Sequence, residues 1–199
     1  MIPPTDRLIR RVLKPALFTL ALLPLALLLA DGWLDRLGAN PVEAITHRTG
    51  DWALRMLLLT LAVTPLRRWS GWTFLLRFRR QLGLFAFFYA CLHLLTWAWL
   101  DQGFAWTAMG EDILERPYIT LGMAALALML PLALTSTNAM MRRLGAQWRR
   151  LHRAVYGIGV LAILHFLWLT KADYLEPALY GLLLAGLLLA RLPWRRRAR

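Results

Sequence analysis

Four histidines are the side chains of this sequence best suited to chemistry: His47, His93, His152 and His165. Two of them, His93 and His165, lie well inside long apolar stretches. Ionisable side chains inside a membrane span are costly and rare, so a histidine in such a place is a functional candidate by default. Neutral imidazole is also a common ligand for transition metals, including iron. The next question is which helices position these two side chains.

Six apolar stretches approach the length of about 17–25 residues that a membrane-spanning helix needs. They cover residues 15–30, 51–66, 82–100, 118–135, 154–170 and 177–192. The chain of 199 residues is 59% hydrophobic, whereas a soluble domain is typically about 45–50% apolar. The first stretch resembles a signal peptide, but no small-x-small cleavage site follows it, so we expect a retained helix. We therefore expect an all-α polytopic membrane helix bundle of six transmembrane helices, forming a single domain over residues 1–199.

The charges are distributed unevenly along the chain, whose formal net charge is +13. Most of the 24 basic residues lie in four segments, at residues 7–14, 67–80, 142–153 and 191–199. Ten of the 11 acidic residues lie in the stretches between these four basic segments. The exception is Asp6, which directly precedes the first of them. The positive-inside rule then predicts that both termini are cytoplasmic, which requires an even number of spans. This pattern favours the lipid bilayer of a bacterial inner (cytoplasmic) membrane as partner and argues against nucleic acid.

The depths of the two buried histidines match. Each lies about 11 residues into a helix that starts on the cytoplasmic side, which is roughly 16 Å at a rise of about 1.5 Å per residue. Two neutral imidazoles at one depth suit a single haem iron with His93 and His165 as its two axial ligands. The alternative is that each histidine separately hydrogen-bonds to a polar group of a neighbouring helix.

His152 opens the fifth apolar stretch at the cytoplasmic boundary, about 20 Å along the helix axis from His165. It is a candidate ligand for a second haem on the cytoplasmic side. The alternative is a surface histidine within a basic loop. His47 lies in the first periplasmic segment, where we expect a loop residue.

Three arginines just before the third apolar stretch are candidates for binding an anion. They are Arg77, Arg79 and Arg80. Arginine forks suit phosphate, so a flavin mononucleotide (FMN) phosphate or an anionic lipid could dock there. The alternative is that they are topology determinants at the level of the lipid headgroups.

Several segments, taken together and in order over about residues 40–170, resemble the MsrQ (YedZ) family. They are Thr49–Leu54 (TGDWAL), Leu61–Arg67 (LAVTPLR), Arg79–Leu84 (RRQLGL), Phe88–His93 (FYACLH) and Trp148–Tyr156 (WRRLHRAVY), with His165 after them. That family belongs to a wider ferric-reductase-like transmembrane group, which includes NADPH oxidases and STEAP proteins.

The resemblance implies a haem b membrane subunit that transfers electrons without being the catalytic subunit. Its partner would be MsrP, a periplasmic molybdopterin enzyme that reduces methionine sulfoxide in envelope proteins. The electrons would come from the quinone pool or a cytosolic flavin reductase, and FMN would bind as well as haem. Carried over, His93 and His165 are the axial pair and His152 is the third family histidine. The arginines before the third stretch are then the FMN-phosphate contacts.

One departure from the wider group concerns the number of haems. NADPH oxidases carry two histidines on each of two helices, whereas the third stretch here has only His93. The chain also has no dehydrogenase domain, so its electron donor must be separate.

Other functions are compatible with parts of this pattern. A stand-alone transmembrane ferric or quinone reductase would use the same histidines. A small transporter would need polar midplane residues and repeated halves, and the sequence offers few midplane acids and no clear repeat. A membrane scaffold without cofactor would lack colour and redox activity. The acidic residues of the periplasmic loops are a candidate docking face for a basic partner. They are Asp101, Glu111, Asp112, Glu115, Asp173 and Glu176.

Overall fold

The computed structural model describes residues 4–170 and 174–192, and all regular elements within these ranges are helical. The helices are α1 (Asp6–Leu8), α2 (Lys14–Trp33), α3 (Pro41–Ser70), α4 (Arg79–Thr96), α5 (Trp106–Glu115), α6 (Pro117–Leu134), α7 (Asn138–Leu144), α8 (Ala146–Leu151), α9 (Ala154–Leu169) and α10 (Leu175–Leu189). A π-helical turn, Ile9–Leu13, joins α1 to α2, and another, Trp97–Asp101, extends α4. A 3-10 turn, Thr73–Arg77, precedes α4. The all-α prediction is confirmed for the described residues.

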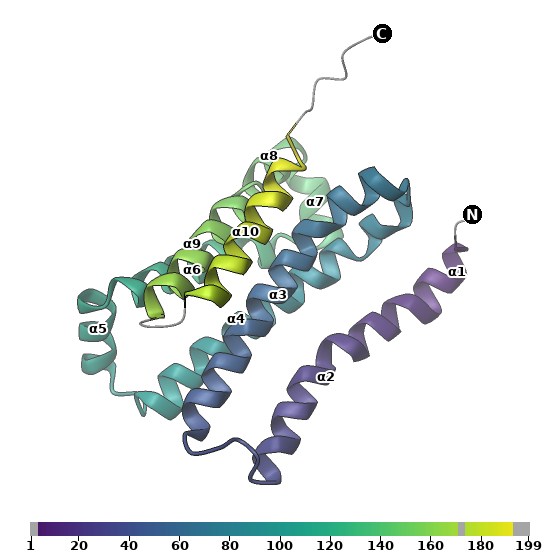
Figure 1. Ribbon diagram of the computed structural model, residues 1–199. Helices are drawn as coiled ribbons and strands as arrows, with labels where there is room; N and C mark the ends of the chain where they lie inside the picture. Colours follow the sequence, from purple (N-terminus) through teal and green to yellow (C-terminus); the bar gives the residue numbers. More distant parts are fainter. Residues whose placement is uncertain (1–3, 171–173, 193–199) are drawn as a thin grey trace.

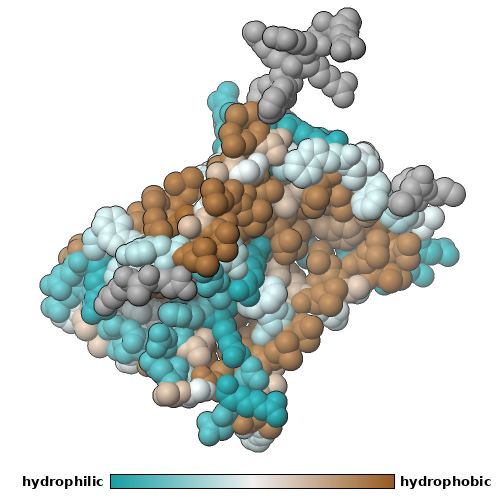
Figure 2. All heavy atoms as spheres, viewed as in Figure 1, coloured by the Kyte–Doolittle hydropathy of each residue, from teal (hydrophilic) through white to brown (hydrophobic). Residues whose placement is uncertain are grey.

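Four helical segments within the described ranges are long and apolar enough to cross a membrane. They are Asp6–Trp33, Arg79–Asp101, Pro117–Leu134 and Ala146–Leu169. The apolar helix α10 is shorter, at 15 residues. Hydrophobic side chains form a band across the middle of the molecule, and hydrophilic ones gather toward its ends (Figure 2). The chain is therefore a membrane protein.

Helix α3 is much longer than the predicted stretch of residues 51–66, since it spans 30 residues. Its true start is encoded locally, because the Asn40 side chain accepts a hydrogen bond from the Glu43 N–H and Pro41 occupies the first turn. It ends at Gly71, which has a φ of 75° and adopts the left-handed conformation. Hydropathy misses the first ten residues because they are polar.

Two helix pairs make the centre of the bundle. Helix α3 packs along α4 and α6 packs along α9, while α4 contacts α6 and joins the two pairs. Helix α10 covers α9 and α3, and the α1–α2 helix lies at the periphery (Figure 1). Leu61 of α3 and Ala86 of α4 are fully buried in the core of the bundle. The Tyr89 hydroxyl reaches across from α4 to donate to the Ala21 carbonyl of α2, at 2.7 Å.

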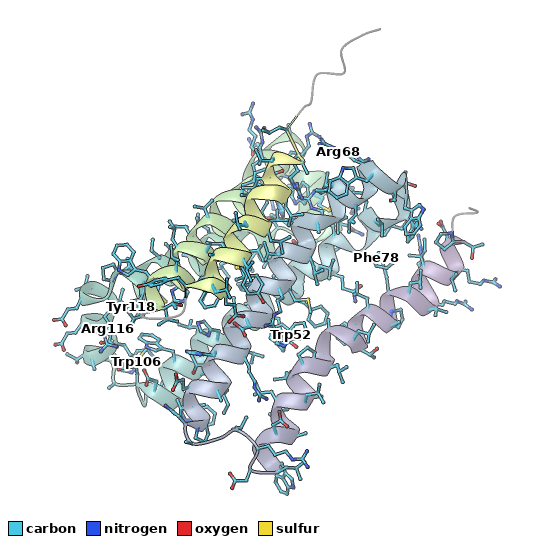
Figure 3. All side chains as sticks on the ribbon, in the orientation of Figure 1. Trp52, Arg68, Phe78, Trp106, Arg116 and Tyr118 are labelled. Atoms are coloured by element: carbon cyan, nitrogen blue, oxygen red, sulfur yellow. The ribbon has the colours of Figure 1, made fainter. Side chains whose placement is uncertain are left out.

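The two ends of the bundle carry charges of opposite sign. Helix α1, the α3–α4 connection, α7, α8 and the end of α10 share one end, and the α2–α3 connection and α5 lie at the other (Figure 1). The first is the basic end, with Arg67, Arg68, Arg142, Arg143, Arg149 and Arg150. The second is the acidic end, with Asp101, Glu111, Asp112, Glu115 and Glu176. Figure 3 labels Arg68 at the basic end and Trp106, Arg116 and Tyr118 at the acidic end.

Arginine side chains tie α10 to the rest of the bundle at both ends. Near the acidic end, Arg55 of α3 donates to the Tyr180 hydroxyl at 2.8 Å and pairs with Asp51 at 3.4 Å. These contacts provide polar partners for the Arg55 guanidinium, which lies within the predicted second stretch of residues 51–66. Near the basic end, Arg191 donates to the Tyr156 hydroxyl at 3.0 Å and also to the Leu61 carbonyl.

The Leu61 carbonyl is available to Arg191 because of a proline. In a helix this carbonyl would accept from the N–H four residues on, and that residue is Pro65, which has none. Arg191, just after the neighbouring helix α10, therefore supplies the missing donor. The contact joins the end of α10 to the middle of α3.

Candidate functional site

His93 of α4 and His165 of α9 meet inside the bundle, at the junction of the two central helix pairs. Their ring centroids are 6.0 Å apart, and the ring planes are inclined at 76°. Helices α4 and α9 both run from the basic end to the acidic end, which gives the histidines equal depth. The expectation that these two side chains lie together is therefore correct.

Each imidazole is anchored by one nitrogen to the backbone of a neighbouring helix. His93 Nδ1 lies 2.9 Å from the Thr46 carbonyl oxygen of α3, and His165 Nδ1 lies 2.6 Å from the Tyr118 carbonyl oxygen of α6. A carbonyl oxygen only accepts, so each Nδ1 must carry the hydrogen. Each Nε2 then keeps its lone pair and is free to bind a metal. The hydrogen-bonding alternative raised by the sequence is thus also correct, and it is compatible with metal binding.

Two glycines provide the space in which these rings lie. A Cβ atom at Gly50 would come within 3.1 Å of His93 Cε1 and Nδ1. A Cβ atom at Gly122 would come within 3.0 Å of His165 Nδ1. Contacts this short require the ring to move, so any larger residue would displace the imidazole. Glycine at both positions lets α3 and α6 approach the rings closely.

The two halves of this site follow one pattern in the sequence. Thr46, Gly50 and His93 each lie 72 positions before their counterparts in the other half, which are Tyr118, whose carbonyl accepts the hydrogen bond, Gly122 and His165. Each glycine therefore precedes its histidine by 43 positions. The sequence interpretation missed this repeat because only a few side chains recur. The equal glycine-to-histidine spacing is the signal that would have found it.

His152 lies apart from the pair, at the break between α8 and α9. Its ring stacks on Trp148 with the centroids 3.8 Å apart, and its Nδ1 lies 3.1 Å from the Trp148 carbonyl. Its Nε2 is buried and has no hydrogen-bond partner in the described part of the chain. His152 borders a cavity of about 350 Å³ that Arg79 and Arg80 also line.

The three candidate arginines diverge rather than converge. Arg77 pairs with Asp6 of α1, and Arg80 donates to the Asn138 side chain at 2.9 Å. Arg79 and Arg80 border the His152 cavity, whereas Arg77 borders a neighbouring groove between α2 and α4, which Arg80 also lines. His47 is exposed, as expected, but it belongs to helix α3, so the prediction of a loop there was wrong.

The histidine pair fits an iron held from two sides. A metal about 2 Å from one nitrogen of each imidazole separates the ring centroids by roughly 6 Å, which is close to the observed separation. Two imidazoles are too few for a structural zinc site, which usually has four protein ligands. Haem iron needs only axial ligands from the protein, and the two Nε2 atoms of this pair are of the right kind and number to provide them.

Comparison with known proteins identifies the class of membrane protein to which this chain belongs. Residues 49–174 match the family described as the ferric reductase like transmembrane component, so the chain is a membrane protein of that class. Over 188 residues it is 53% identical to the protein-methionine-sulfoxide reductase heme-binding subunit MsrQ of Xanthomonas campestris pv. campestris (strain 8004), covering 92% of this chain and 84% of the relative. The subunit of that name from Herminiimonas arsenicoxydans is 51% identical over 186 residues, covering 92% of this chain and 85% of the relative. The chain belongs to the MsrQ family. No solved structure matches it.

Proposed function

We propose that this chain is the haem b membrane subunit of a methionine-sulfoxide reductase system. It would pass electrons to MsrP, the periplasmic molybdopterin enzyme that repairs methionine sulfoxide in envelope proteins. The observation that carries this proposal is the pair of imidazoles, His93 and His165, with their centroids 6.0 Å apart and both Nδ1 atoms anchored. The names of the relatives, which are heme-binding subunits, support it.

The protein's own part is to orient the ligands and exclude water. The Thr46 and Tyr118 carbonyls fix the tautomer and the rotation of each ring, and they make each Nε2 a stronger donor to iron. Gly50 and Gly122 leave the space that the two rings occupy, because a side chain at either position would crowd the imidazole. Bound haem supplies one-electron transfer between ferric and ferrous iron, and its potential is set by the axial ligands and their apolar surroundings.

We further propose six spans in the bacterial inner membrane, with both termini in the cytoplasm. The four apolar segments, together with α3 and α10, would make the six crossings. The basic end would then face the cytoplasm, as the positive-inside rule requires. The acidic end would face the periplasm.

The acidic end is the proposed exit for electrons and the docking face for MsrP. Tyr118, whose carbonyl holds His165, is the second residue of α6, which begins at this end. The pair therefore lies close to the surface formed by α5 and the adjoining connections. Acidic side chains there would meet a basic patch on the partner. Asp173, which the sequence assigned to the same face, lies outside the described residues.

The His152 cavity is the proposed place for a second prosthetic group, either FMN or a second haem. Its volume of about 350 Å³ falls within the range of about 300–1,000 Å³ typical of ligand sites. Arg79 would bind the group's phosphate or carboxylates, and the free His152 Nε2 is a potential ligand. Since the cavity lies toward the basic end, the donor, a quinone or a cytosolic flavin reductase, would deliver electrons there.

The first test is the absorption spectrum of the purified protein, oxidised and dithionite-reduced, with haem counted per chain. One low-spin b-type haem is expected from the pair, and a second or a bound flavin from the His152 cavity. The reduced protein should then be mixed with MsrP and oxidised methionine. Reoxidation that depends on MsrP supports the electron-transfer role. A protein that stays colourless after haem addition contradicts it, and turnover with ferric iron or quinone alone would favour a stand-alone reductase.

A further inference from the structure

A groove separates the peripheral helix α2 from the start of α4, next to the His152 cavity, with which it shares Lys14, Arg80 and Leu84. Its volume is about 490 Å³. It is lined by Lys14, Phe18, Leu22, Arg77, Arg80, Gln81, Leu84, Phe85 and Phe88. Figure 1 shows α2 at the edge of the bundle, and Figure 3 labels Phe78 toward the basic end.

The mouth of the groove carries positive charge without a carboxylate in its lining. Lys14, Arg77 and Arg80 lie there together. Arg77 pairs with Asp6, but both side chains are exposed, at 43% and 69%, so water weakens this pair. Arg80 donates to the Asn138 side chain, which is neutral. Most of the positive charge at the mouth is therefore left for an anion from outside the chain.

The two walls of the groove, formed by α2 and α4, both change from charged to apolar side chains with depth, at matching positions along the two helices. From Lys14, steps of four residues along α2 lead to Phe18 and Leu22, and from Arg80 the same steps along α4 lead to Leu84 and Phe88. Both helices enter from the basic end, so the two walls have the same polarity. Eight residues of helix correspond to about 12 Å. The groove thus has a basic mouth and an apolar shaft about two turns deep.

Two hydrogen bonds hold α2 to α4 at either end of this shaft. The Gln81 side chain donates to the Lys14 carbonyl at 3.0 Å, and the Tyr89 hydroxyl donates to the Ala21 carbonyl at 2.7 Å. Just before Lys14 the helix widens into the π-helical turn Ile9–Leu13, where Pro15 cannot donate to the carbonyl four residues before it. Phe18 remains 52% exposed between the two ties. The Phe18 and Phe85 rings meet between the two helices, with their centroids 5.2 Å apart, and form part of the wall of the shaft.

We propose that this groove binds one anionic phospholipid of the surrounding leaflet. The phosphate and its headgroup lie between Lys14 and Arg80, and an acyl chain lies along Phe18, Leu22 and Phe88. A neutral isoprenoid such as a quinone would fill the shaft but leave the cations of the mouth uncompensated. A water-soluble phosphate would leave the apolar shaft empty. The lipid would bridge α2 to the bundle, independently of any haem.

The test uses the full-length protein, delipidated in neutral detergent, with phosphatidylglycerol or phosphatidylcholine added back in mixed micelles. Retained lipid is counted by native mass spectrometry, and thermal unfolding is followed in parallel. Phosphatidylglycerol should be retained and should raise the unfolding temperature, whereas phosphatidylcholine should do neither. Each basic residue near a membrane surface contributes about 1 kcal/mol to anionic lipid binding, so Lys14→Gln should weaken retention about fivefold and Lys14→Gln with Arg80→Gln about 25-fold.

Three comparisons make the result decisive. Lys14→Arg keeps the charge and should retain the lipid. Arg142→Gln with Arg143→Gln removes two exposed charges from α7 at the same end and should change nothing. Leu22→Trp should block the shaft while leaving the mouth intact. Equal retention of both lipids, or a Lys14 and Arg80 double variant that behaves like the α7 control, would overturn the proposal. So would displacement of phosphatidylglycerol by ubiquinone with no dependence on these charges.

Discussion

The two histidine sites of the bundle are built in different ways. At the His93–His165 site, two imidazoles come from different helix pairs, and each is fixed by a backbone carbonyl of a neighbouring helix and confined by a glycine. At the His152 site a single histidine is fixed within its own segment, by the Trp148 carbonyl and ring, and its free nitrogen borders a cavity. The first site is shaped closely around two imidazoles, whereas the second offers space and arginines. The first should therefore be intolerant of change and the second adaptable.

Replacing one histidine of the His93–His165 site is the strongest way to test this contrast. His93→Ala and His165→Ala should each abolish the low-spin haem spectrum, because one imidazole alone cannot complete the axial pair. His152→Ala should leave that spectrum in place and affect only a second haem or flavin. Haem content and spectra of the three purified variants check this. The exposed His47→Ala is the matched control, and full haem content in His93→Ala would refute the assignment.

The confining glycines should show the next largest effect. Gly50→Ala and Gly122→Ala insert a methyl group against an imidazole, and overpacking of this kind typically costs about 1–3 kcal/mol. Haem affinity should fall about 5- to 150-fold, and the reduction potential should shift because the ring orientation changes. Gly157→Ala in α9 is the control, since nothing lies within 4 Å of its added Cβ. If all three variants bound haem equally, the glycines would have no positioning role.

The tie between α10 and α3 should have a smaller effect, and on stability rather than on haem ligation. Arg191→Leu leaves the Leu61 carbonyl without its donor and removes the bond to Tyr156. Loss of hydrogen bonds to buried groups costs about 1–3 kcal/mol, so the unfolding temperature in detergent should fall by several degrees. Arg142→Gln, at the same end, should not change it. An unchanged unfolding temperature for Arg191→Leu would contradict the role of this contact.

The docking face should give the smallest effect, and only at low salt. Glu111 and Glu115 are exposed one turn apart on α5, whereas Asp112 is already paired with Arg116 at 3.1 Å. Glu111→Gln with Glu115→Gln should slow association with MsrP a few-fold at low ionic strength and hardly at all at high salt. Stopped-flow reoxidation measures this rate. Asp6→Asn, at the basic end, should have no effect, and salt-independent association would exclude the acidic face.

Sequence reasoning succeeded where one helix at a time determines the answer. The depths of His93 and His165 follow from helix rise alone, and so their meeting could be predicted. The anchoring carbonyls of Thr46 and Tyr118 could not, because they depend on how two helices are rotated against each other. The divergence of Arg77 from Arg79 was missed for the same reason, since Arg77 ends the 3-10 turn Thr73–Arg77 whereas Arg79 begins α4, and the two side chains line different cavities.

The start of α3 illustrates a different failure. Hydropathy detects the apolar part of a helix, whereas the helix itself begins where its first N–H groups are capped. Here Asn40 is the cap, and the helix begins at Pro41, ten residues before the predicted stretch. The extra turns matter, because they carry Thr46 and Gly50 to the His93 ring. A boundary error of this size therefore hid half of the site's surroundings.

The contact between Arg191 and the Leu61 carbonyl has a consequence for how the chain is made. In the proposed six-span topology, helix α3 enters the membrane early in synthesis with one carbonyl that Pro65 has deprived of its usual donor. The donor lies beyond α10 and leaves the ribosome only after every other described helix. Until then the middle of α3 carries an unfilled polar site in a lipid environment. The last helix thus closes the assembly, and a chain whose synthesis stops before Arg191 would expose that carbonyl to recognition by membrane quality control.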